Sequence, residues 1–230
     1  MFPLHDDNPT RITPYVTYAL IIICVAAFFW QLSLGKYVQN AIYSLGMIPA
    51  VLFNLRELPP ELAAIPPWTT LFTSMFLHGG WMHLIGNMLY LFIFGNNVED
   101  AMGHRRFIVF YLICGVAAAL AQAIPNPQSV VPMIGASGAI SGVLGAYLLL
   151  YPHARILIVI PIFFYPYTVR VPAGIVLLFW FGGQILSSMM VGDQEGGVAF
   201  GAHIGGFVAG LALIPFFKYK RVRLFAPARR

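Results

Sequence analysis

Six apolar runs are spaced along the chain, and short polar or charged stretches separate them. A helix that crosses a membrane needs roughly 20 predominantly apolar residues. The pattern therefore predicts six membrane-spanning helices, the second of them preceded by a semi-polar approach over Trp68–Leu77. The six runs are Tyr15–Leu34, Trp81–Phe94, Phe107–Ala123, Met133–Tyr151, Ala173–Val191 and Val198–Phe217.

Composition indicates that lipid is the solvent of this chain. Of its 230 residues, 59% are hydrophobic and 9% are charged, whereas a soluble domain carries roughly 25% charged residues. In a bilayer, each backbone polar group must be satisfied within its own segment, so the runs should be helices. The predicted fold class is an all-α membrane protein with a six-transmembrane-helix bundle.

Basic residues predict how the bundle is oriented. With the N-terminus in the cytoplasm, only Lys36 and Arg56 among the 13 lysines and arginines lie outside, as the positive-inside rule favours. Both termini are then cytoplasmic. We expect a cytoplasmic segment over 1–14, the membrane domain over 15–217 and a basic tail over 218–230. The net charge of +5 does not indicate nucleic-acid binding, because no basic stripe is interleaved with stacking aromatic residues.

Two connections between the runs are unusual. The stretch Gly35–Pro67 is long and rich in proline, and loops of this length are usually functional or disordered. Its apolar residues between Val51 and Leu58 predict a membrane-associated first loop rather than a free linker. The stretch Ile156–Val171 is apolar but interrupted by two prolines. It is too short and broken for a further span, and the pattern predicts interfacial structure of undefined conformation on the cytoplasmic side.

Ionisable residues inside membrane spans are costly and therefore informative about function. The runs contain His83 and His203 but no aspartate or glutamate. An intramembrane aspartyl protease needs two facing carboxylates, and a metalloprotease needs two histidines four apart with a glutamate. The pair His78 and His83 has neither the spacing nor the carboxylate. We therefore expect no metal and no cofactor; His78 should be interfacial and His104 should lie in a cytoplasmic loop.

A hydroxyl and an imidazole remain, at matching depth. Ser137 lies four residues after the start of the fourth run, and His203 lies five after the start of the sixth. At about 1.5 Å per residue, both would lie roughly 6–8 Å below the outer ends of their helices. A histidine can activate a serine hydroxyl near neutral pH, and with no carboxylate in the spans this predicts a catalytic dyad.

Donors for an oxyanion are predicted on two helices. His83 and Asn87 are four residues apart and so share one helix face, and the backbone N–H of Ser137 could join them. Gly135 and Gly138 would let a substrate backbone approach closely. Glycines at small-xxx-small spacing predict close packing of the fourth and sixth helices; beside Gly138 these are Gly142, Gly145, Gly206 and Gly210.

Three motifs, on the expected spans, resemble those of the rhomboid family. They are Gly135-Ala136-Ser137-Gly138, Ala202-His203 with Gly206 and Gly210, and His83-Leu84-Ile85-Gly86-Asn87. The resemblance implies an intramembrane serine protease that cleaves transmembrane proteins near the membrane surface without metal or ATP. Ser137 would be the nucleophile, His203 the general base, and Asn87 and His83 part of the oxyanion site. The fifth helix would be a lateral gate for substrate. The compact six-span form suggests a prokaryotic cell membrane.

Two departures from the family pattern stand beside this resemblance. Trp68 is followed by Thr69, where many members have arginine, and Ser141 stands where some members have a tyrosine that stacks on the histidine. His203 must then be held by another group.

Two other classes of function are alternatives to the protease. An inactive rhomboid-like protein that binds membrane clients usually lacks the serine or the histidine, and a transporter would show repeats or broken, charged helices.

Overall fold

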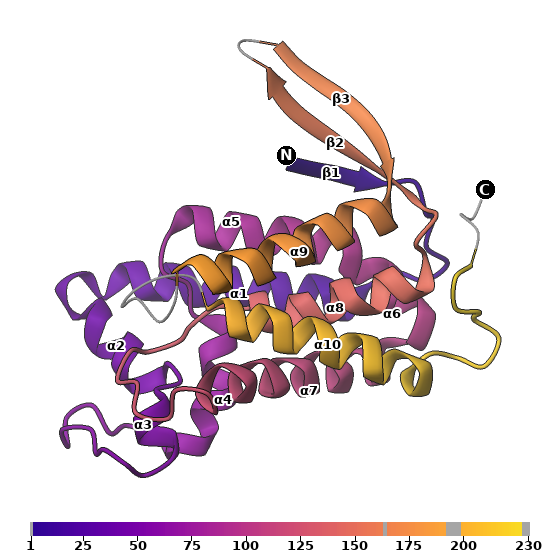
Figure 1. Ribbon diagram of the computed structural model, residues 1–230. Helices are drawn as coiled ribbons and strands as arrows, with labels where there is room; N and C mark the ends of the chain where they lie inside the picture. Colours follow the sequence, from indigo (N-terminus) through magenta and orange to yellow (C-terminus); the bar gives the residue numbers. More distant parts are fainter. Residues whose placement is uncertain (1, 163–164, 192–198, 227–230) are drawn as a thin grey trace.

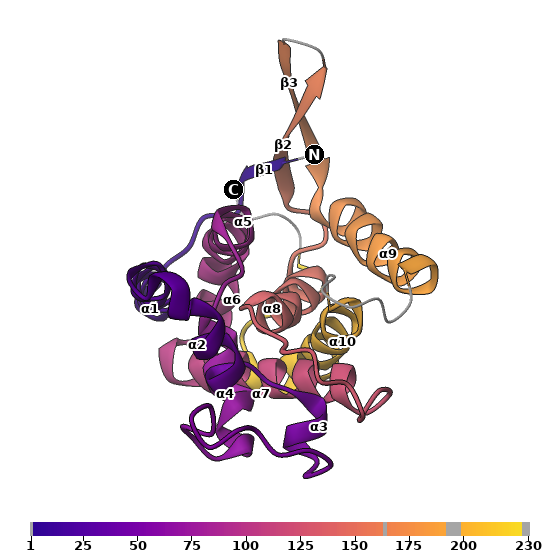
Figure 2. The same cartoon turned by 90° about the vertical axis from the view of Figure 1, so that its left-hand side faces the viewer.

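The computed structural model describes residues 2–162, 165–191 and 199–226 of the chain. Its body is a bundle of long helices whose axes run in similar directions (Figures 1 and 2). A continuous helical path leads from Trp81 to Met102, and its middle is π-helical. The bundle consists of α1 (Tyr15–Ser33), α5 (Trp81–Tyr90), η4 (Leu91–Gly95), α6 (Asn96–Met102), α7 (His104–Ala123), α8 (Ser137–Leu150), α9 (Ala173–Val191) and α10 (Phe200–Phe217).

Four of these helices are long and apolar enough to cross a membrane, within the residues that the structure describes. They are α1, α7, α9 as far as Met190, and α10. Helix α8 is apolar but has only 14 residues, fewer than the roughly 20 that a straight crossing requires. The structure therefore supports a helical membrane protein, while the count of six spans stays a prediction.

The first long connection folds into short helical pieces at one end of the bundle (Figure 1). Pro49 and Pro67 each occupy the first turn of such a piece, where a missing N–H costs nothing. Whether this loop lies in the membrane stays a prediction. The pieces are η1 (Gly35–Tyr37), α2 (Val38–Leu45), α3 (Pro49–Leu52), η2 (Pro67–Thr69), α4 (Thr70–Thr73) and η3 (Ser74–Phe76).

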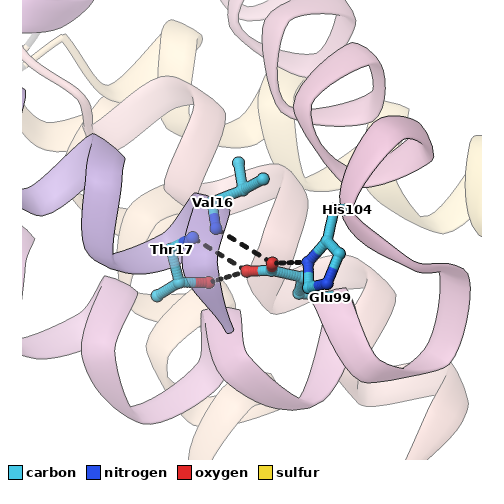
Figure 3. Close-up of polar contacts among 4 residues, drawn as sticks. All are labelled: Val16, Thr17, Glu99 and His104. Carbon is cyan, nitrogen blue, oxygen red and sulfur yellow. Dashed lines mark hydrogen bonds and ion pairs between the residues drawn. The ribbon is translucent and has the colours of Figure 1, made fainter. Parts of the chain in front are cut away.

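The second predicted helix was too short, because the helix continues beyond Phe94 to Met102. This continuation includes Glu99 and Asp100, which are 0% and 7% exposed. The expectation that the helices carry no carboxylate was therefore wrong. The charge of Glu99 is tolerated because donors surround it (Figure 3). The backbone N–H groups of Val16 and Thr17 and the Thr17 hydroxyl donate to its carboxylate over 2.7–3.0 Å.

His104 belongs to the same cluster, so its predicted place in a loop was also wrong. It is the first residue of α7, and its Nδ1 lies 2.5 Å from Oε1 of Glu99. Gly103, with φ +81°, makes the turn between α6 and α7, in a backbone region that favours glycine. The carboxylate of Glu99, on α6, thus contacts the start of α1 and the start of α7.

A three-stranded antiparallel sheet corrects the prediction of an all-α fold. Its order is β1-β2-β3, from β1 (Phe2–Asp6), β2 (Arg155–Ile162) and β3 (Tyr165–Pro172). Ala154, Ile156 and Ile158 are buried at every second position, which is the period of a strand rather than of a helix. Pro161 and Pro166 face each other near the end of the hairpin, where a missing N–H is tolerated. The segment predicted to be interfacial is therefore a β-hairpin, which projects from the bundle and pairs with the N-terminal strand (Figure 1); its place at the membrane interface stays a prediction.

The fourth helix begins later than predicted: α8 starts at Ser137 rather than Met133. Helix α10 starts at Phe200, and Val198, the predicted start of the sixth helix, lies outside the described residues. Met133 instead pairs with Met47 in an isolated β-bridge. Gly135 has φ +125°, which no helix allows. Ser137 is therefore the first residue of its helix, not one turn inside it.

Helices α8 and α10 approach each other closely through glycine. A Cβ built on Gly206 would overlap the carbonyl of Gly138, and one on Gly210 would overlap the carbonyl of Gly142. A Cβ on Gly145 would meet the backbone of Phe207 in the same way. The glycines predicted to pack these two helices therefore lie in their interface, and this interface fixes the distance between Ser137 and His203.

Candidate functional site

A cavity of about 1490 Å³ opens between the helices at the end of the bundle where α8 and α10 begin. Helices α5, α8, α9 and α10 all contribute to its wall. The polar side chains that line it include His83, Asn87, Ser137, Gln184 and His203. The structure thus brings all four predicted reacting or stabilising side chains to one cavity and adds Gln184, which the sequence analysis had not singled out.

Ser137 and His203 are in hydrogen-bond contact. Oγ of Ser137 lies 2.8 Å from Nε2 of His203. The serine is placed by the start of α8, and the histidine is the fourth residue of α10, so the glycine contacts between these helices hold the pair together. A hydroxyl that donates to a neutral imidazole in this way can be activated for attack on a carbonyl.

His83 presents a ring nitrogen to the same space. The backbone N–H of Gly79 donates to its Nδ1 over 3.3 Å, so Nδ1 carries a lone pair and the proton sits on Nε2. The position that a Cβ on Gly135 would take lies 2.7 Å from this Nε2 and 3.7 Å from Oγ of Ser137. Glycine at 135 therefore keeps open a point near both a donor and a nucleophile, where a reacting atom could stand.

Two further donors belong to residues that line the same cavity. Asn87 is 7% exposed, and its amide nitrogen Nδ2 has no hydrogen-bond partner among the described residues. A buried donor without a partner costs about 1–3 kcal/mol, so its position in a cavity wall calls for a functional explanation. The N–H of Ser137 lies in the first turn of α8, and no side chain caps this helix. Helix N-termini favour negative charge.

His78 and Ser141 also lie near the reacting pair. His78 is 1% exposed, and its ring lies edge-on to that of His83 at 5.3 Å between centroids; its place at the membrane interface stays a prediction. Ser141 does not reach His203, because its hydroxyl donates to the carbonyl of Ser137 over 2.7 Å. The group that contacts the other side of the base is Gln184, whose Oε1 lies 2.7 Å from Nδ1 of His203.

Gln184 was missed because charged and titratable side chains in the spans were considered first as candidate site residues. The sequence does contain a signal. Gln184 lies amid the apolar residues of the fifth run, four positions after Trp180, and residues so spaced share one helix face.

Within the described ranges, no three histidine, cysteine, aspartate or glutamate side chains come together as they would around a metal ion.

The model of one protein family matches most of the chain. The Rhomboid domain matches residues 66–220, a range that contains the site side chains described above. The chain belongs to the rhomboid family. With its long apolar helices, this makes it a multi-pass membrane protein.

Individual relatives are similar to this rhomboid over parts of their length. Rhomboid protein 1, mitochondrial, of Saccharomyces cerevisiae is 28% identical over 75% of the chain and 52% of its own length. Rhomboid protease GluP of Bacillus subtilis is 34% identical over 59% of the chain and 24% of its own length. A putative rhomboid protease, YdcA, of the same bacterium is 30% identical over 60% of the chain and 63% of its own length. The chain thus spans between about a quarter and two thirds of the length of these relatives.

Proposed function

We propose that this rhomboid is an intramembrane serine endopeptidase that cleaves transmembrane proteins at or just below the outer membrane surface. Ser137 is the nucleophile and His203 the general base of a dyad. The observation that carries the proposal is the 2.8 Å contact between Oγ of Ser137 and Nε2 of His203 inside a polar-lined cavity. Relatives that bear the name rhomboid protease support it.

Acylation follows from this geometry. Nε2 of His203 takes the proton of the Ser137 hydroxyl as Oγ attacks the scissile carbonyl carbon, and the C=O π electrons move to the oxygen. The imidazolium then returns this proton to the leaving amine as the C–N bond breaks. In the second half, His203 takes a proton from water as the water oxygen attacks the acyl carbon. The imidazolium then returns this proton to Oγ of Ser137 as the ester C–O bond breaks and the new carboxyl end of the substrate leaves. No metal and no cofactor is required in these steps.

Three donors serve the oxyanion of each tetrahedral intermediate. His83, Asn87 and Ser137 line the same cavity, and Nε2 of His83 lies beside the space that Gly135 leaves open. Because Asn87 Nδ2 is buried without a partner among the described residues, it can gain a bond in the transition state without first breaking another bond within the protein. Such preorganised donors stabilise the charge that develops during reaction. Gly135 and Gly138 leave room for the substrate backbone.

The substrate class and topology complete the proposal. A cavity within a helix bundle and near one of its ends is suited to a peptide segment that leaves the membrane. We place both termini in the cytoplasm of a cell membrane, with the cavity toward the outer leaflet, because basic residues concentrate at the other end. Cysteine residues introduced at the two ends of the chain, labelled from one side of sealed vesicles, test this orientation.

A reporter assay tests the activity. The purified protein in detergent or proteoliposomes is mixed with single-span reporters that carry small, helix-breaking residues near one membrane boundary, and products are mapped by mass spectrometry. The matched variant Ser137→Ala removes only the hydroxyl. We expect cleavage by the wild-type protein near the boundary and none by the variant.

Labelling with a fluorophosphonate gives a second measurement that needs no substrate. We expect the probe to attach to Ser137 and to require His203. Equal cleavage by wild type and Ser137→Ala, or an unreactive serine together with intact reporters, would overturn the proposal and favour a client-binding rhomboid.

A further inference from the structure

The base of the dyad needs a partner on its second nitrogen. Neutral imidazole has two tautomers, and only the one with its proton on Nδ1 leaves Nε2 free to accept from Ser137. The side chain that stands one turn after the nucleophile, Ser141, is occupied with the carbonyl of Ser137. The tautomer must therefore be set from another helix.

We propose that Gln184 is the positioning residue of His203. Its Oε1 lies 2.7 Å from Nδ1 of the imidazole, and it accepts the Nδ1–H bond that directs the lone pair of Nε2 toward the Ser137 hydroxyl. This inference rests on the proposed protease function. It converts the dyad into a line of three side chains from three helices, with a neutral amide in the place of a carboxylate.

A second contact from the same helix supports this role. The ring of Trp180 lies 5.9 Å from that of His203, centroid to centroid, with 36° between the planes. Trp180 and Gln184 are four residues apart, so one face of α9 both packs against the imidazole and accepts the hydrogen bond from its Nδ1–H. The orientation of the ring and its tautomer are thus set by a single element.

Among the four described helices that are long and apolar enough to cross a membrane, α9 is the least enclosed by the protein. Only 11% of the residues in its apolar stretch are buried, and Figure 2 shows the helix at the margin of the bundle. The side chains of Phe179 and Met189 on its other faces are 75% and 80% exposed. Any displacement of α9 from α10 breaks the Gln184–His203 bond, so the base is correctly set only while α9 is docked.

An amide is suited to this position by its charge. A carboxylate would add a charge to a helix that is mostly exposed to lipid, where charges are costly. The amide oxygen fixes the tautomer at a lower energetic cost in lipid than a carboxylate would. It also stabilises the imidazolium less than a carboxylate would. We therefore expect its loss to reduce kcat by about tenfold to a hundredfold, below the roughly 10⁴-fold effect of replacing the carboxylate in a serine–histidine–aspartate triad.

Kinetics on three variants test the proposal. Gln184→Leu removes the acceptor at similar volume and should lower kcat with little change in KM. Gln184→Glu keeps an oxygen in place; it should retain more activity than Gln184→Leu and should move the acidic limb of the pH–kcat profile, because its charge acts on the imidazolium. The control Gly183→Ala alters the neighbouring position, where an added Cβ meets nothing within 4 Å, and should behave as wild type.

The tautomer itself is a readout that does not depend on proteolysis. Nitrogen-15 NMR of histidine-labelled protein, with His203 assigned by comparison with His203→Asn, should show the proton on Nδ1 in the wild type and on Nε2, or on both in exchange, in Gln184→Leu. Failure of the protease proposal would appear as an unreactive Ser137 with this tautomer intact. A wild-type proton on Nε2, as when the amide nitrogen of Gln184 faces the ring, overturns the positioning role. Unchanged kcat and tautomer in Gln184→Leu overturn it equally.

Discussion

Replacing Glu99 by alanine should detach the start of α1 from the bundle. The carboxylate accepts from two backbone N–H groups, of Val16 and Thr17, and from the Thr17 hydroxyl (Figure 3). Pro14, which precedes α1, provides no side-chain cap. Glu99 therefore caps this helix from another one, and its loss leaves buried donors without a partner.

The size of the effect follows from these bonds. Thr17 and Glu99 are both 0% exposed, so solvent cannot replace the carboxylate. Each orphaned buried donor costs about 1–3 kcal/mol, and breaking a buried charged contact costs about 3–5 kcal/mol in total, because the costs do not add fully. We expect Glu99→Ala to lower the free energy of unfolding by this amount. Thr17→Val removes one donor and should cost only about 1 kcal/mol.

Thiol labelling measures this locally. Cys24 lies on α1, is 0% exposed and forms no disulfide, so it reacts only when α1 opens. In a Cys114→Ser background, Glu99→Ala should accelerate labelling of Cys24 about a hundredfold or more, since each 1.4 kcal/mol corresponds to tenfold, and should lower Tm. Labelling rates within twofold of the parent protein would refute the assignment of Glu99 as the cap of α1.

Three further changes have defined outcomes. Gly210→Ala forces a methyl group into the carbonyl of Gly142 and should reduce both Tm and activity, whereas Gly182→Ala, with nothing within 4 Å of the added Cβ, should leave both unchanged. Burial raises the pKa of Asp6 to about 6, so the folded state holds this proton more tightly than the unfolded chain. The contribution of Asp6 to stability should therefore be complete below about pH 4 and fall by up to about 3 kcal/mol as the pH rises through 6, and Asp6→Asn should remove this part of the pH dependence from denaturant melts. Asn87→Ala should lower kcat by about 10²–10³-fold with the fold intact by circular dichroism; an unchanged kcat would remove Asn87 from the oxyanion site.

The predicted arrangement of the reacting side chains followed from how rarely lipid tolerates polar groups. Ser137 and His203 could be paired from sequence because their runs have the same direction and each begins a few residues earlier. Ser137 and His203 are neighbours as predicted, although the fourth helix begins later than predicted. That start was missed because Gly135 adopts a positive φ, and hydropathy does not detect such a backbone turn.

Features outside the apolar pattern were the hardest to predict. The helix that ends at Met102 passes through Glu99 and Asp100, and a hydropathy reading stops at such charges. Hydropathy does not show that residues more than 80 positions earlier donate hydrogen bonds to Glu99. The β-hairpin was missed for a related reason. Its alternation is visible in sequence, but hydropathy does not reveal that β1, at the N-terminus, pairs with it as a third strand.

The two ends of the bundle show how this chain separates stability from chemistry. Around Glu99, each carboxylate oxygen has at least two partners, and the cluster connects α6 to the starts of α1 and α7. Around Ser137, Asn87 Nδ2 is buried without a partner among the described residues, and Gln184 holds the base from α9, the least enclosed of the four candidate spans. An unpaired donor is destabilising where nothing binds, but in a cavity wall it is ready for a charge that arises only in reaction. The cost at the site end is tolerable because the satisfied end and the glycine contacts of α8 with α10 fix the helices that carry it.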